Sequence, residues 1–254
     1  MVALSQISGL VVLGLVIPLM PRATPTVADL QWGIAAGLAG TVGVALLYRA
    51  LAIGTMGVVA PVTAVCAVAI PVVASMFAGE FPSRLAGAGI GLALVAIVLV
   101  AQEDRGAAFE PGAPRPHVLP PGVLIALLSG VAIGVFFLLL ARTEREAGLW
   151  PLVGSRSVSL VCFVAAALAL RRPLRLPLGD ALTCAGCGVL DTAANVLYLL
   201  ASREGSLPLV VTLSSMYPAS TVLLARIVLG ERLSRLQMAG LYCALLAVAL
   251  IVRG

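Results

Sequence analysis

Charged residues are scarce in this chain, and one basic residue type is missing altogether. Only 11% of the 254 residues are charged, whereas a soluble domain carries about a quarter. No lysine occurs, and the arginines stand singly or in pairs between apolar runs rather than in a basic stripe. The net charge of +5 therefore indicates loop anchors at a membrane face, and it argues against a nucleic-acid-binding protein.

Residues that carry metal, redox or nucleotide chemistry are also few. The one histidine, His117, stands alone in a polar stretch, and no GxxxxGK[ST] motif occurs that would bind ATP. Cys184 and Cys187 have CxxC spacing, but no second pair and no neighbouring histidine accompany them. We interpret these thiols as small packing groups. The sequence predicts no cofactor, no metal site and no enzyme.

Apolar sequence is what the chain has in abundance, since 61% of its residues are hydrophobic. A helix needs about 17–25 mostly apolar residues to span a bilayer. No positive charge precedes the first run, which predicts a spanning helix rather than a cleaved signal. The fold class is therefore all-α, a polytopic membrane helix bundle. Its nine predicted spans are 1–20, 31–50, 56–78, 84–102, 120–141, 149–170, 180–201, 207–229 and 235–252.

The sequence repeats itself at an offset of 151 residues. Gly79-Glu80 aligns with Gly230-Glu231, and Ser83-Arg84-Leu85 aligns with Ser234-Arg235-Leu236, without any gap. An internal repeat in a membrane chain is typical of transporters built from two homologous halves. We predict a first repeat over 1–102, a linker over 103–119 and a second repeat over 120–254.

The repeat also predicts the number of helices in the fold. The predicted helix 120–141 has no partner, because the offset would place that partner before Met1. We therefore expect a ten-helix design whose first helix is missing here, most simply because the start is assigned too late. Five helices per half is an odd number, so the second half enters the membrane in the opposite sense. The halves are then inverted repeats around a midplane site, which gives alternating access.

Several segments of both halves match the sequence pattern of a known family. They are 47–54, Pro61, Gly79-Glu80 and Ser83-Arg84 in the first half, and 198–201, Pro218, 229–234 and 237–240 in the second. On these segments, which cover nearly the whole chain, the protein resembles EamA-type transporters of the drug/metabolite transporter superfamily. The resemblance implies ten helices, an inner-membrane location, and export or uptake of small organic solutes such as amino acids and metabolites.

Polar residues inside one run, where the two halves differ, are the strongest site candidates. Asp191 lies in the middle of run 180–201, and Asn195 and Tyr198 follow at i+4 and i+7 on the same helix face. An ionisable side chain at bilayer depth is costly and normally faces a bundle interior or a water-filled cavity. These residues are predicted to bind substrate or to couple a proton. The alternative is a structural Asp capped by hydroxyls or by Arg156.

Arg156 is the other ionisable residue inside a run. It is predicted to pair with Asp191, to bind a substrate carboxylate, or to extend to the interface. Ser214 and Tyr217 in run 207–229, and Thr63 in run 56–78, lie in helices interrupted by proline. We expect them to line a binding site, the alternative being packing between helices.

The repeated Gly-Glu motif is interpreted as structural. Glu80 and Glu231 stand four residues before an arginine, at a spacing that favours a pair on the helix surface. Ser234 with Gln237 three residues later predicts a capping box for the last helix. The alternative, a proton relay through the two glutamates, is less favoured because carboxylates near a helix start are stabilised by the helix dipole.

Together these features predict a secondary transporter of small organic solutes, most simply an exporter, in the cell (inner) membrane. The expected partners are the lipid bilayer and a small solute, with proton coupling through Asp191 and a homodimer as additional expectations. Two alternatives stay open: a non-transporting fragment or scaffold of a membrane complex, and a polytopic lipid-modifying enzyme. The second lacks the constellation of His, Asp or Glu that such chemistry needs.

Overall fold

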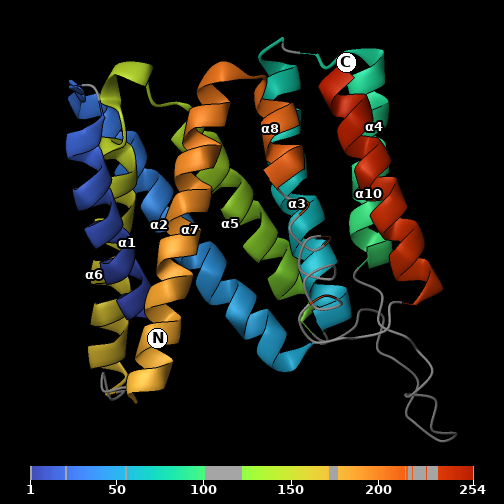
Figure 1. The fold of residues 1–254 in the computed structure, drawn as a ribbon. Helices are drawn as coiled ribbons and strands as arrows, with labels where there is room; N and C mark the ends of the chain where they lie inside the picture. The colour runs from blue at the N-terminus through green and yellow to red at the C-terminus, as the bar shows by residue number, and fades with distance from the viewer. Residues whose placement is uncertain are drawn as a thin grey trace, which may run out of the picture. The chain divides into compact units, whose positions relative to one another are not determined.

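A computed structural model describes most of the chain, and every regular element in the described part is a helix (Figure 1). It describes residues 2–20, 22–54, 56–79, 81–100, 122–171, 177–214, 216, 219, 227 and 234–253. The predicted all-α class is confirmed. The helices are α1 (Val2–Val16), α2 (Val27–Ile53), α3 (Met56–Phe77), α4 (Arg84–Val100), α5 (Val123–Ala141), α6 (Trp150–Ala169), α7 (Leu178–Glu204), α8 (Leu207–Ser214) and α10 (Arg235–Arg253).

Five segments of the described chain are long and apolar enough to cross a membrane, so the protein is a multi-pass membrane protein. They are Val2–Leu19, Val27–Ile53, Val123–Ala141, Trp150–Ala169 and Leu178–Glu204. Two of them, α2 and α7, are longer than the predicted runs 31–50 and 180–201. The predicted runs are shorter because a high hydropathy identifies only the residues of a helix that lie in the hydrocarbon layer of the membrane. At 27 residues each spans about 40 Å, which reaches through the headgroup layers.

The offset of 151 residues recurs in the helix bounds. Shifting α7 by 151 residues gives the bounds of α2, and the starts of α8 and α10 shift onto the starts of α3 and α4. The predicted boundaries of the repeats, and their inverted orientation, stay predictions.

Packing divides the chain into two compact units that cut across the sequence halves. The first unit holds Met1–Val42 and Val135–Gly205, and the second holds Gly43–Gly134 and Ser206–Gly254. The first therefore contains α1, α6 and α7, and the second contains α3, α4, α8 and α10, with the dividing line inside α2 and α5. Each unit takes corresponding helices from both halves of the sequence.

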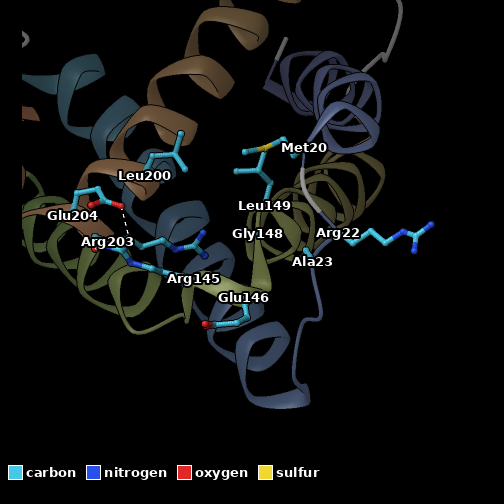
Figure 2. Close-up of a pocket in the computed structure, with 10 residues that line it drawn as sticks. All are labelled: Met20, Arg22, Ala23, Arg145, Glu146, Gly148, Leu149, Leu200, Arg203 and Glu204. Carbon is cyan, nitrogen blue, oxygen red and sulfur yellow. Dashed lines mark hydrogen bonds and ion pairs between the residues drawn. The ribbon is translucent and has the colours of Figure 1, made fainter.

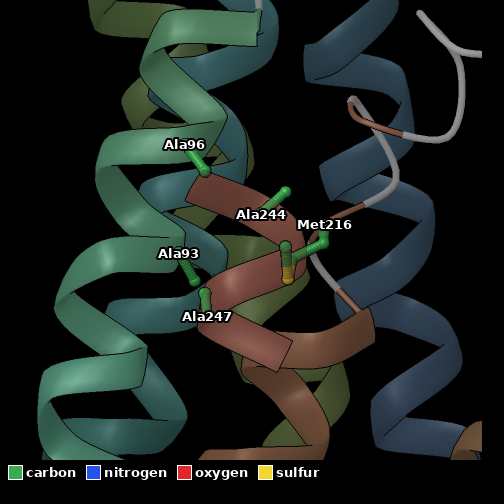
Figure 3. Close-up of a cluster of buried hydrophobic side chains, with 5 residues drawn as sticks. All are labelled: Ala93, Ala96, Met216, Ala244 and Ala247. Atoms are coloured by element: carbon green, nitrogen blue, oxygen red, sulfur yellow. The ribbon is translucent and has the colours of Figure 1, made fainter. Parts of the chain in front are cut away.

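Small side chains dominate the packing of the second unit. Ala93 and Ala96 of α4 meet Ala244 and Ala247 of α10, with Met216 beside them (Figure 3). All five are at least nine-tenths buried within the chain. Small residues allow two helix backbones to approach closely in lipid, where no hydrophobic effect drives helices together. Close packing of small side chains thus holds the α4·α10 pair in the described part of the chain.

Helix starts carry the expected capping chemistry. The predicted box at α10 is confirmed, because the Gln237 N–H donates to Ser234 Oγ at 3.2 Å and the Ser234 N–H donates to Gln237 Oε1 at 2.9 Å. Ser83, the repeat partner of Ser234, accepts from the Ala86 N–H at the start of α4. Such bonds satisfy N–H groups that the first helical turn leaves unpaired.

Candidate functional site

The contact between α1 and α7 in the first unit lies at the centre of the candidate site. In Figure 1 the two helices run side by side with α6. Gly188 of α7 is pressed against α1, and a Cβ at this position would collide with Ser8 Oγ and with the backbone of Ser5. Four residues later, Thr192 is fully buried and its hydroxyl donates to the Gly188 carbonyl at 2.6 Å. Glycine is therefore required here for close approach of the two backbones.

The contact between α2 and α6 repeats this arrangement. Gly37 of α2 is pressed against the backbone of Ser155 in α6, where a Cβ would collide. The Thr41 hydroxyl donates to the Gly37 carbonyl at 2.7 Å, and Ser159 Oγ lies 2.9 Å from Thr41 Oγ1. Gly37 and Thr41 stand 151 residues before Gly188 and Thr192. The two contacts are thus corresponding parts of the repeat.

Arg156 ties three helices together. It is 5% exposed, and its guanidinium lies beside Gly9 of α1. Its Nη1 donates to Gln6 Oε1 of α1 at 3.0 Å, and its Nη2 donates to Asp191 Oδ2 of α7 at 2.6 Å. Of the three predicted roles for Arg156, the pair with Asp191 is the one seen in the structure.

The two charges of this pair are buried unequally. The Arg156 side chain is 6% exposed within the chain, whereas that of Asp191 is 59% exposed. Among the described residues, the buried Arg156 Nε finds no hydrogen-bond acceptor. A buried guanidinium needs an anionic partner to offset its desolvation, and it binds carboxylates in a two-bond fork. The Arg156 guanidinium can therefore hold a carboxylate. The carboxylate that it holds in this structure, Asp191, is exposed at the surface of the unit.

The two other predicted residues on α7 have different surroundings. Asn195 Nδ2 donates to the Asp191 carbonyl at 2.8 Å and lies 3.3 Å from Asp191 Oδ1, so it helps to orient this carboxylate. Tyr198 is 4% exposed, and its hydroxyl donates to the Phe137 carbonyl of α5 at 3.0 Å. Asn195 thus belongs to the site of the Arg156–Asp191 pair, whereas Tyr198 packs between α7 and α5.

Thr63 and Ser214 lie in the second unit and are repeat partners. Thr63 is 1% exposed, and its hydroxyl donates to the Ala126 carbonyl of α5 at 3.3 Å. Ser214, at the end of α8, is exposed. Tyr217 lies outside the described residues, as do the linker 103–119 and three residues of the repeated motif, Glu80, Gly230 and Glu231. Gly79 is described and has a φ of +87°, a conformation that favours glycine.

Gln6 is the residue of this site that sequence reasoning missed. It is the only amide side chain in the first apolar run, which was the available signal. Its repeat partner is Ser157, so comparison of the halves would also have singled it out. An isolated amide in lipid is costly unless it is bonded, and Arg156 supplies that bond.

Comparisons with known proteins agree with this architecture. A family model described as the EamA-like transporter family matches residues 120–253, which confirms the resemblance seen in the sequence. The curated proteins gave no match. A solved structure titled "Crystal structure of protein" is similar at 16% sequence identity and a TM-score of 0.63, over 99% of this chain and 98% of that chain. At that identity the similarity shows the fold alone.

Proposed function

Because the chain belongs to the EamA-like transporter family, we propose that it is a secondary transporter that exports a small organic solute across the cell (inner) membrane. The observation that carries this proposal is the Arg156–Asp191 pair, which joins a buried cation to an accessible carboxylate between transmembrane helices. Ionisable groups at such depth normally mark substrate or ion pathways. We propose that the solute is a metabolite or an amino acid. That the protein forms a homodimer stays a prediction.

Transport proceeds by alternating access, with the two sequence repeats exchanging conformations. The recurrence of helix bounds at an offset of 151 residues supports this proposal, because inverted repeats allow each half to adopt the other's arrangement. The glycine–threonine contacts of α2 with α6 and of α1 with α7 would be retained in both arrangements, since they belong to both repeats.

Proton coupling acts through Asp191 in this proposal. A protonated Asp191 loses its charge and its hold on Arg156, so the guanidinium becomes free to bind an anionic group of the solute. The 59% exposure of the Asp191 side chain supports this role, because the chain itself leaves more than half of this side chain uncovered. Glu80 and Glu231 are not needed for this cycle.

The test is solute flux in proteoliposomes, with candidates first chosen by growth protection against toxic metabolites. Asp191→Asn is expected to remove the pH dependence of flux. Asp180→Asn is the matched control, because Asp180 lies in the first turn of the same helix and is exposed. An unchanged pH dependence in Asp191→Asn would exclude coupling through this residue. Absence of flux for every protective solute would overturn the transporter proposal and favour a scaffold.

A further inference from the structure

The first unit has a pocket of about 400 Å³ at the ends of its helices (Figure 2). Met20, which follows the short 3₁₀ turn Ile17–Leu19, lines it together with Leu149 before α6 and Leu200 near the end of α7. Since α1 and α7 end here and α6 begins here, the pocket lies at the boundary between hydrocarbon and headgroups. It is separate from the Arg156–Asp191 pair, whose residues do not line it.

Three arginines and two glutamates supply the charges of this pocket. Arg145 pairs with Glu204 at 2.8 Å, and both side chains are more than half exposed. Arg145 also donates to the Arg203 carbonyl. Glu146 carries the second carboxylate, and Arg22 extends outward from the opposite wall (Figure 2). The lining therefore has one more positive charge than negative.

Arg203 is the group whose bonding is incomplete. Its Nη2 donates to Thr143 Oγ1 at 3.3 Å. In the described part of the chain, its Nε is buried and has no acceptor. The nearby Asp29 is 2% exposed, and its oxygens already accept from Thr26 and from the Glu144 N–H. Because Arg203 also lines the pocket, an acceptor bound there would add to the one side-chain hydrogen bond that its guanidinium makes among the described residues.

An apolar wall faces these charges. Met20 and Leu149 lie close together in Figure 2, with Leu200 on the neighbouring helix. A free ion would leave this wall uncovered, whereas an amphiphile would cover it. Arginine forms paired hydrogen bonds with phosphate oxygens, and basic pockets between transmembrane helices at the interface suit the headgroups of anionic lipids.

We propose that this pocket binds the phosphate group of an anionic membrane lipid. Arg203 and Arg145 hold the phosphate oxygens, and Met20, Leu149 and Leu200 contact the glycerol and the first methylenes of the acyl chains. The proposal does not depend on the transported solute, because the site belongs to one end of the first unit. Inorganic phosphate shares the recognised chemistry but not the apolar part, so it serves to distinguish a lipid site from an ion site.

The experiment is lipid binding by native mass spectrometry of the purified chain. Phosphatidylglycerol is titrated against phosphatidylcholine with the same acyl chains. Wild type is expected to prefer phosphatidylglycerol, and Arg203→Gln to weaken that preference about fivefold, the typical effect of one basic residue near an anionic surface. Glu204→Gln is expected to strengthen it, because Arg145 is released from its carboxylate. This second variant decides the matter if Arg203→Gln does not fold.

Arg171→Gln is the matched control. Arg171 is exposed and follows the opposite end of α6, about 30 Å along the helix axis from the pocket, so its removal leaves the preference unchanged. The proposal is overturned if wild type shows no preference or if Glu204→Gln does not raise it. It is also overturned if millimolar inorganic phosphate displaces the lipid, since an ion site would then account for the binding.

Discussion

The contact of α2 with α6 and the contact of α1 with α7 share one plan but differ in charge. Each has a glycine pressed against a neighbouring backbone, a threonine four residues later and a serine on the facing helix. These residues are Gly37, Thr41 and Ser159 in the first contact, and Gly188, Thr192 and Ser8 in the second. Arg156 follows Ser155 in α6, but its guanidinium lies at the second contact, where an acid and an amide are its partners.

The comparison separates the residues that pack the helices, which both contacts have, from the polar and charged residues that are found in the second contact. The repeat partners of Arg156, Asp191 and Gln6 are Ser5, Gly40 and Ser157, none of which can carry a charge. The neutral contact therefore demonstrates that the glycine–threonine plan packs two helices without an ion pair. A buried ion pair is weak support for stability, since desolvation offsets its attraction. This is why we propose a function, rather than a packing role, for the Arg156–Asp191 pair.

The largest effect is expected when the ion pair is broken on one side only. Asp191→Asn should lower the free energy of unfolding by about 3 kcal/mol, because the stranded charge is the buried Arg156. Arg156→Met should cost less, about 1–2 kcal/mol, because Asp191 is more than half exposed and the loss falls mainly on Gln6, which loses its bond to Arg156. The double variant should recover part of the loss. Thermal unfolding in detergent measures all three, and an equal or larger loss in Arg156→Met would contradict the unequal burial of the pair.

Next in size are the glycines that both contacts share. Gly37→Ala and Gly188→Ala should each cost about 1–3 kcal/mol, because the new Cβ meets backbone atoms that cannot move independently. Gly14→Ala in α1 and Gly186→Ala in α7 are the controls, since a Cβ at either position meets no described atom within 4 Å. The same unfolding measurement applies. Similar losses of unfolding free energy in the test and control variants would show that close approach of the helix backbones does not require glycine at positions 37 and 188.

A smaller effect is expected from the threonines. Thr192→Val should cost less than about 1 kcal/mol, because the glycine carbonyl keeps its helical N–H bond when the hydroxyl is lost. Thr41→Val should cost somewhat more, since it also loses the contact with Ser159 on the facing helix. Differential unfolding of the two variants measures this order, and the reverse order would show that the two threonines do not play corresponding roles.

The smallest effect is expected for an ion pair outside both contacts. Arg145→Gln removes the pair with Glu204, whose side chains are 59% and 71% exposed. Exposed pairs contribute about 0–1 kcal/mol, so the unfolding temperature should hardly change. Adding salt should have equally little effect on wild type. If Arg145→Gln lowered stability as much as Asp191→Asn, burial would not determine how much an ion pair contributes to the stability of this protein.

Much of this architecture could be predicted from the sequence. Apolar runs located the helices because a lipid-facing helix must be apolar along its length. The repeat then aligned α7 with α2, and it marked Asp191 as a residue without a charged partner in the other half. Pairing of Asp191 with Arg156 was one of the stated alternatives, because few other ionisable residues lie inside the runs.

The rest depended on packing that the repeat does not specify. An internal repeat tells which helices correspond, but not which helices touch. Nothing in the sequence pattern indicated that α1 would pack on α7 of the other half rather than on its neighbours in sequence. Gln6 was missed for the same reason, since its role depends on a helix 150 residues away. The outer turns of α2 and α7 were missed because interfacial residues interrupt the hydropathy signal without ending the helix.

The division of the chain into units that cross its halves has a consequence for biosynthesis. Gln6 leaves the ribosome 150 residues before Arg156, a delay of roughly 10–30 s at ordinary rates of translation. During that interval we expect α1 to be in the membrane without its bond to Arg156, and α2 to lack the helix that covers Gly37. The early helices must therefore wait in lipid, or beside the insertion machinery, until the second half is made. Slowing translation between the halves would lengthen the time for which these polar groups are exposed to quality-control proteases.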